Sequence, residues 1–171
     1  IKALYKYGVT GGHSDDLSYF SGPKETLDIF FETLNNLPFR AHLLMHHKII
    51  DEFIDSKLSF LDQNKYLQLG AVKIFYDGTF TSKTALLHDS YKHEDTQGLR
   101  IFEYNQLTKL VKKLRKHDLT LAIHVIGDLG LEEVVDLLET YPVKKGLHDR
   151  IIHASLADLK TELADVKINL I

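Results

Sequence analysis

The sequence contains no cysteine and no tryptophan. The lack of cysteine excludes disulfide bonds, iron–sulfur clusters and thiolate chemistry, so histidine, carboxylates and lysine remain as the strong ligands or catalysts. Disulfides mark oxidising compartments, and the absence of cysteine is consistent with the cytoplasmic location that we predict.

Long apolar runs and strongly basic segments are also missing. No run approaches the roughly 18 apolar residues of a membrane-spanning helix, so we predict no membrane partner. The formal net charge is -3, and no run of basic residues is longer than the one at 112–116, which is typical of a solvated helix face. We therefore predict no nucleic-acid partner. With 44% hydrophobic and 26% charged residues, the composition is that of a soluble globular protein.

Residues 121–128 form the most informative stretch, a short apolar run that carries one histidine and ends in Gly-Asp. This pattern predicts a buried strand with a polar exit. The strand period of two places Ala122, His124 and Ile126 on one face, so an imidazole lies among packed side chains. A buried imidazole needs hydrogen-bond partners or a bound metal to offset the loss of hydration.

Two other predicted strands repeat this design. Residues 71–78 bury Lys73 between apolar neighbours, and residues 150–154 place His153 at the end of an apolar strand. Taken singly, His124 is more typical of a satisfied core residue, and Lys73 could reach solvent or pair with Asp77. Three strands with the same pattern favour one cavity that binds a divalent metal. Because an ammonium group cannot bind a metal, Lys73 would need either a lowered pKa or conversion to a carbamate.

The predicted order of elements is β-α-β-α-β-loop-α-β-α-β-α-β, with strands that are apolar on both faces. A (β/α) barrel is our first expectation and a doubly wound sheet the second. Residues 77–103 show no regular period and predict a functional loop over the site. Asn105 is the predicted cap of the following helix, and segments 157–163 and 166–171 predict a helix and a strand. No phosphate-binding glycine motif follows any strand, which disfavours a nucleotide-binding α/β domain.

The motifs at 72–79, 82–85, 122–128 and 149–154 resemble those of the metal-dependent amidohydrolase superfamily. Within it, the sequence is most similar to the YtcJ-like branch that includes N-substituted formamide deformylases. The resemblance implies an α/β fold, a TIM (β/α)8-type barrel that is incomplete, with about strands 2 to 7 present. Residues 1–171 would then be a single partial catalytic domain, truncated at both ends.

The resemblance also implies a metal centre with one or two divalent ions, usually zinc. It assigns Lys73, often carboxylated in the family, His124 and His153 as metal ligands. Asp77 and Asp128 match acidic residues near the ends of strands, where they would orient ligands or contact substrate. His13 is a further candidate for substrate contact. The first-strand histidine pair and the general base of the family are expected outside this sequence, so the catalytic base is unknown.

The implied function is hydrolysis of a non-peptide carbon–nitrogen bond, in a small amide or formamide, by a metal-activated water. We expect the fragment alone to be inactive and to form homo-oligomers, because an open run of barrel strands has unpaired edges. The alternative is a non-catalytic barrel remnant used for binding or assembly. Of the remaining histidines, His46 and His47 could line the mouth of the barrel, but their interpretation as surface or loop residues is favoured. His117 and His148 are interpreted as residues at the bottom of the barrel.

Overall fold

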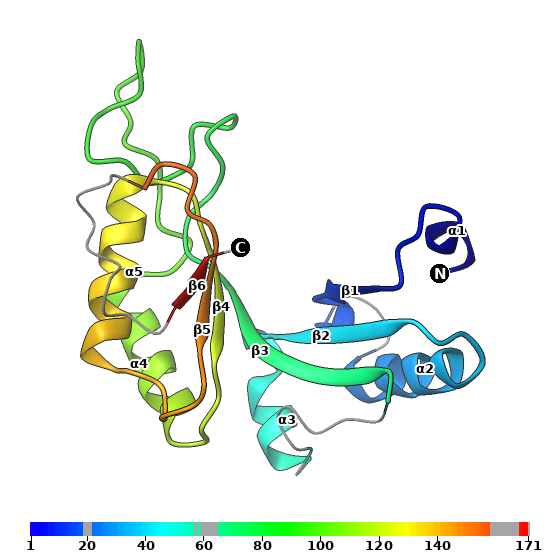
Figure 1. The fold of residues 1–171 in the computed structure, drawn as a ribbon. Helices are drawn as coiled ribbons and strands as arrows, with labels where there is room; N and C mark the ends of the chain where they lie inside the picture. The colour runs from blue at the N-terminus through cyan, green and yellow to red at the C-terminus, as the bar shows by residue number, and fades with distance from the viewer. Residues whose placement is uncertain (19–21, 57, 59–64, 158–167, 171) are drawn as a thin grey trace. The chain divides into compact units, whose positions relative to one another are not determined.

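The computed structural model describes residues 1–18, 22–56, 58, 65–157 and 168–170. Helices and strands alternate along the chain (Figure 1), as the α/β prediction requires. The contacts divide the chain into two compact units, Ile1–Lys73 and Ile74–Ile171, which are described in turn. Among the described residues, no helix is both long and apolar enough to cross a membrane.

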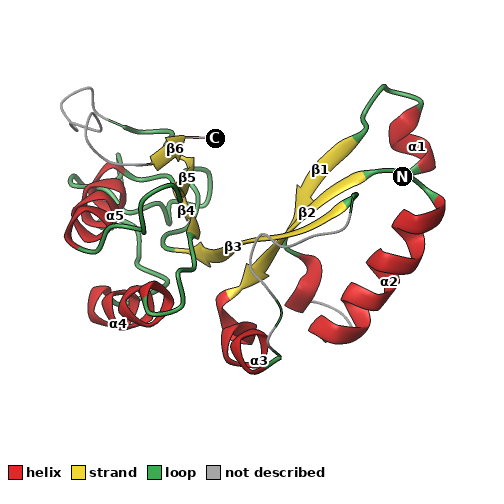
Figure 2. Cartoon of the chain, turned by 60° about the horizontal axis from the view of Figure 1, so that its bottom comes forward, coloured by secondary structure: helices red, strands yellow, loops and turns green. Residues whose placement is uncertain are grey.

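The first unit consists of three parallel strands with helices between them. Its elements are α1 (Lys2–Tyr5), β1 (Gly11–Ser14), α2 (Pro23–Asn36), β2 (Arg40–His46), α3 (Ile50–Asp55) and β3 (Leu67–Phe75), whose last two residues belong to the second unit. The strands pair in the order β1-β2-β3, in a register that aligns His13 with His42 and His42 with Gln68. The helix α2 lies alongside these strands (Figure 2).

The alternation of side chains along β2 explains the two faces of this small sheet. Ala41, Leu43 and Met45 are buried in the apolar core of the unit. Because successive side chains of a strand point to opposite faces, Arg40 and His42 lie on the other face. The first unit therefore combines an apolar face with a face that carries polar side chains.

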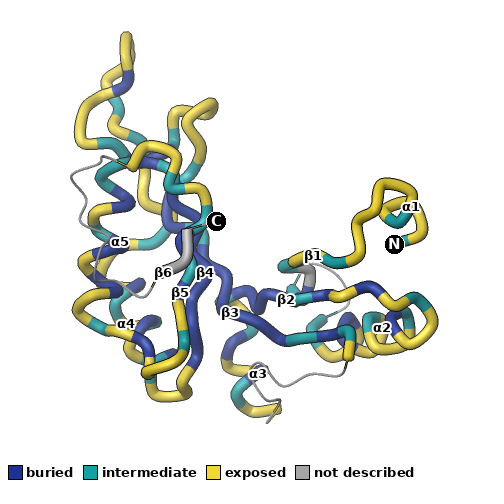
Figure 3. The backbone as a smooth tube through the Cα atoms, viewed as in Figure 1, coloured by how far each residue is buried: buried dark blue, intermediate teal, exposed yellow. Residues whose placement is uncertain are grey.

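The second unit has the same parallel arrangement. It contains α4 (Tyr104–Arg115), β4 (Leu121–Val125), α5 (Asp128–Thr140), β5 (Asp149–His153) and β6 (Ile168–Leu170). The strands pair in the order β4-β5-β6, and α4 and α5 cover one side of β4 and β5 (Figures 1 and 2). Every residue of β4 is buried, as Figure 3 shows, so the prediction of a buried strand around His124 is confirmed.

The predicted loop between β3 and α4 is confirmed, since residues 76–103 contain no helix or strand apart from an isolated bridge between Asp77 and Arg100. Backbone hydrogen bonds nevertheless fix its course. Leu99 N–H donates to the carbonyl of Thr84, and Ile101 N–H donates to that of Tyr76. The later part of the loop is therefore tied both to its earlier part and to Tyr76, which directly follows β3.

Some predicted boundaries were wrong. The helix α4 begins at Tyr104 with Glu103 at its N-cap, because the extended backbone of Glu103 lets its carbonyl accept the N–H groups of Gln106 and Leu107. Asn105 is therefore inside the helix and does not cap it. The predicted helix at 157–163 falls, apart from Ala157, outside the described residues. The strand predicted at 166–171 is described only as β6.

Candidate functional site

Two of the three predicted metal ligands lie together in the second unit. His124 is the fourth residue of β4, and His153 is the last residue of β5. These strands are parallel neighbours, with Val125 aligned to His153. The two imidazole rings meet edge to face, with centroids 4.8 Å apart. Since parallel strands end at the same edge of a sheet, the fold itself brings the two rings to one place.

The backbone at the end of β5 adopts an unusual conformation. His153 and Ala154 have φ angles of +81° and +43°, in the left-handed region. For a residue with a side chain, such a conformation costs on the order of 1–3 kcal/mol and is concentrated at functional sites. A hydrogen bond from Ala154 N–H to the carbonyl of Val125 holds this turn. His153 is exposed here, unlike the buried His124, because it is the point at which the chain leaves the sheet.

The hydrogen bond of His124 defines which of its ring nitrogens can bind a metal. His124 Nε2 lies 2.9 Å from the carbonyl oxygen of Gly78. Because a carbonyl oxygen only accepts, Nε2 must carry the proton. In the neutral ring, Nδ1 then has the lone pair, and the carbonyl fixes the orientation of the ring. Gly78 belongs to the long loop, so this loop does reach the candidate site.

Asp77 lies at the centre of a cluster of hydrogen bonds close to His124. Its carboxylate, 1% exposed, accepts N–H groups from Ile126 at 3.0 Å, Gly127 at 2.8 Å and Leu86 at 3.0 Å. Its Oδ1 lies 3.8 Å from His124 Nε2, which is close for charge interaction but beyond a hydrogen bond. Asp77 therefore joins the long loop to the turn that follows β4.

Asp128, the second predicted carboxylate, begins α5. Its Oδ1 accepts the N–H groups of His88 at 3.1 Å and Leu129 at 2.9 Å. A carboxylate is favourable at a helix N-terminus, where the backbone N–H groups lack helical partners. This side chain therefore fastens the long loop, at His88, to the start of α5.

Lys73 belongs to the first unit, where it is 6% exposed on β3. Its partner in the register is His46 on β2, which is also 6% exposed. The interpretation of His46 as a surface or loop residue was therefore wrong. Burial and the neighbouring Lys48 charge lower the pKa of His46, and burial lowers that of His47 to about 4. The sequence did contain a signal for the buried position of His46. It lies two strand periods after His42, within the same apolar strand.

His13 also belongs to the first unit. Its ring stacks on that of His42, with centroids 4.5 Å apart and planes at 30°. His42 Nδ1 in turn lies 2.9 Å from Gln68 Oε1. The role of His13 in substrate contact stays a prediction.

Two polar clusters of the second unit were not predicted. Asp149, buried at the start of β5, forms an ion pair of 2.6 Å with Arg115 and accepts Leu121 N–H at 2.8 Å. Glu133 on α5 binds Arg100 and Tyr76 of the loop region. In both clusters the partners are more than 25 residues apart, so no local pattern identifies them.

The residues present fit a divalent metal in part. Two neutral imidazoles at neighbouring strand ends, one of them oriented by a carbonyl, are suitable donors for zinc or a similar ion. Within the described residues, however, no group of three or more His, Cys, Asp or Glu side chains could hold a metal ion. The second unit thus supplies a pair of imidazoles to which further ligands would have to be added.

The chain is similar to two proteins of known sequence. The chain is 38% identical over 162 residues to the Bacillus subtilis (strain 168) protein YtcJ, which is named as an amidohydrolase, covering 92% of this chain and 30% of that protein. It is 28% identical to the Arabidopsis thaliana protein LONG AFTER FAR-RED 3, covering 81% of this chain and 24% of the relative. The chain therefore spans about a third or less of the length of these relatives.

Two solved structures share the fold. One is an uncharacterized metal-dependent hydrolase from Pyrococcus horikoshii OT3, with a TM-score of 0.81 and 26% identity, covering 99% of this chain and 34% of that one. The other, from Pyrococcus furiosus, has a TM-score of 0.76 and 22% identity, covering 92% and 32%. The predicted incomplete TIM-type barrel is thereby confirmed. The model of the amidohydrolase family matches residues 1–168, and the chain belongs to this family.

Proposed function

We propose that the protein from which this chain derives is a metal-dependent hydrolase that cleaves a non-peptide carbon–nitrogen bond in a small amide or formamide. The family membership and the metal-dependent hydrolase that shares the fold support hydrolysis. The choice of a carbon–nitrogen bond rests on the motifs shared with the formamide-cleaving branch. Because the chain spans so small a part of its relatives, we expect it to be inactive alone.

The observation that carries the proposal is the approach of His124 and His153, whose ring centroids are 4.8 Å apart at the ends of adjacent parallel strands. We assign both as ligands of a divalent metal, preferably zinc, with His124 acting through Nδ1. When bound, such a metal polarises the scissile carbonyl and supplies a water nucleophile. The carbonyl of Gly78 holds the His124 ring in the required tautomer.

Lys73 is proposed as the third ligand, in carboxylated form. An ammonium group has no lone pair to donate, whereas a carbamate formed with carbon dioxide offers two oxygens. Its burial supports this role, since a buried ammonium group is costly. Asp77 and Asp128 would keep the loop and the end of β4 in place around the ligands.

The test uses the full-length parent and an N-substituted formamide as substrate. We expect zinc-dependent release of formate, and a loss of at least about a thousandfold in turnover for Lys73→Ala. A carbamate signal in carbon NMR after incubation with labelled bicarbonate should be present in the parent and absent in this variant. Hydrolysis that is unaffected by Lys73→Ala would contradict the ligand assignment. A parent with no hydrolase activity and no bound metal would instead support the non-catalytic alternative.

A further inference from the structure

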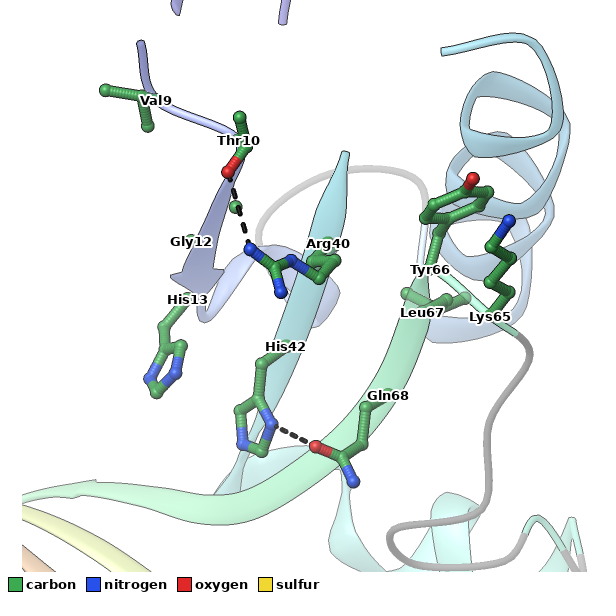
Figure 4. A pocket seen from close by; sticks show the side chains of 12 residues that line it. Val9, Thr10, Gly12, His13, Arg40, His42, Lys65, Tyr66, Leu67 and Gln68 are labelled. Atoms are coloured by element: carbon green, nitrogen blue, oxygen red, sulfur yellow. Dashed lines mark hydrogen bonds between the residues drawn. The ribbon is translucent and has the colours of Figure 1, made fainter. Parts of the chain in front are cut away.

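The polar face of the first unit forms a pocket that includes His13 but none of the proposed metal ligands. It has a volume of about 680 Å³ and is lined by twelve residues from the start of β1, β2 and β3 and the segments that lead into them. This volume falls in the range that holds small organic ligands. Figure 4 shows His13, His42 and Gln68 side by side across the three strands, with Arg40 above them.

The charges of the pocket have one sign. Arg40 and Lys65 are both among the lining side chains, together with His13 and His42. Among the described residues that line the pocket, none is Asp or Glu. Arg40 is held towards the pocket by a contact of its guanidinium with Thr10 Oγ1, at 3.4 Å. The pocket therefore presents donors and positive charge without an internal counter-charge.

The backbone and a neighbouring side chain fix the position of the His42 ring. A Cβ placed on Gly70 would lie 1.8 Å from His42 Nε2, so only glycine leaves room for the imidazole above the strand. On its other side, the ring of His42 is fixed by Gln68 Oε1 at 2.9 Å. A polar side chain held in this way is pre-organised, which reduces the cost of binding.

We propose that this pocket binds a small organic molecule through an oxyanion, either a carboxylate or a phosphate. Arg40 is the principal contact, because its planar guanidinium can bind two oxygens of such a group at once. Lys65 adds charge at the rim, and the stacked rings of His13 and His42 form the floor. The proposal concerns the first unit alone and stands whether or not the protein is a hydrolase.

The test is a titration of the chain with inorganic phosphate and, separately, with acetate, at constant ionic strength, followed by calorimetry and amide NMR. We expect saturable binding of at least one anion, with shifts in the amides of Gly12, His42 and Gln68. Arg40→Gln should weaken this binding roughly tenfold, and Arg40→Lys less. Saturation by phosphate alone or by acetate alone identifies the ligand group.

Lys6→Gln is the matched control, since Lys6 is exposed in the same unit but does not line the pocket. It should bind the anion as the unmodified chain does. Lys65→Gln provides a second variant, with circular dichroism as a check of folding, if Arg40→Gln fails to fold. The proposal is overturned if neither anion saturates, if Arg40→Gln and Lys65→Gln both bind normally, or if Lys6→Gln weakens binding equally.

Discussion

Asp77 Oδ2 accepts a hydrogen bond of 2.8 Å from the backbone N–H of Gly127, fifty residues further along the chain. The same oxygen accepts Leu86 N–H, and Oδ1 accepts Ile126 N–H. One buried carboxylate thus satisfies three backbone donors from the two segments that meet at His124. The geometry of the candidate site depends on this side chain even though it is not proposed as a ligand.

Replacing this carboxylate by an amide is therefore expected to destabilise the second unit. Asp77→Asn keeps only one acceptor oxygen, so at least one buried N–H loses its partner, at a cost of about 1–3 kcal/mol. Urea titrations measure the free energy of unfolding. Asp89→Asn, at an exposed position of the same loop, is the control and should change stability by less than about 0.5 kcal/mol. Equal effects of the two substitutions would contradict the role given to Asp77.

The ion pair of Arg115 and Asp149 gives a larger expected effect. Arg115→Met leaves the buried carboxylate without its cation, which costs about 3–5 kcal/mol at neutral pH. Thermal and urea unfolding of the variant and the unmodified chain would measure this loss of stability. Lys109→Met, at an exposed position of the same helix, should be nearly neutral. If both variants unfold at the same denaturant concentration, the pair does not stabilise the fold.

The cost of Arg115→Met should also depend on pH. Burial raises the pKa of Asp149, although Arg115 and the Leu121 N–H oppose this effect. The folded state therefore binds the proton more tightly than the unfolded state, whose pKa is about 3.9. Removing Arg115 raises the folded pKa further, so the destabilisation should shrink as the pH falls from that raised pKa towards the folded pKa of the unmodified chain.

The pKa of Glu133 is shifted in the opposite direction to that of Asp149. Burial alone would raise its pKa, but the hydrogen bonds from Arg100 and Tyr76 and the Arg100 charge outweigh burial and lower it. A lowered folded pKa stabilises the protein above the unfolded value of about 4.3, and this contribution is lost as the pH falls through the folded pKa. Since Arg100 is 34% exposed, we expect Glu133→Gln to cost only about 1 kcal/mol at neutral pH.

The measurement is the free energy of unfolding at about pH 7 and about pH 3. The difference between the unmodified chain and Glu133→Gln should shrink at the lower pH. Glu132→Gln is the control, because that carboxylate is 57% exposed and its ion-pair partner His88 is half-exposed. A constant difference across this pH range would show that Glu133 does not titrate in the cluster.

The sequence predicted those features that depend on local periodicity. Buried strands must be apolar, so the pattern around His124 identified β4, and the period of two placed the imidazole correctly within it. The order of helices and strands likewise pointed to the barrel. These predictions succeeded because burial constrains the residue at every position of such elements.

The sequence could not predict features that depend on distant segments. The bond from His124 to the Gly78 carbonyl and the three N–H groups on Asp77 arise only when turns far apart in the sequence meet. The buried position of His46 was missed because a histidine at the end of a strand can equally lie in a surface loop. The start of α4 was misplaced because the backbone carbonyl of Glu103, rather than a typical capping side chain, begins the helix.

The most direct test of the metal site is elemental analysis of the full-length parent after incubation with zinc, for the unmodified protein, His124→Asn and His153→Asn. The proposal predicts stoichiometric zinc in the unmodified protein and a loss of most of it in both variants. His148→Asn, exposed just before β5, is the control and should retain the metal. Full zinc content in all three variants would contradict the assignment of His124 and His153 as ligands.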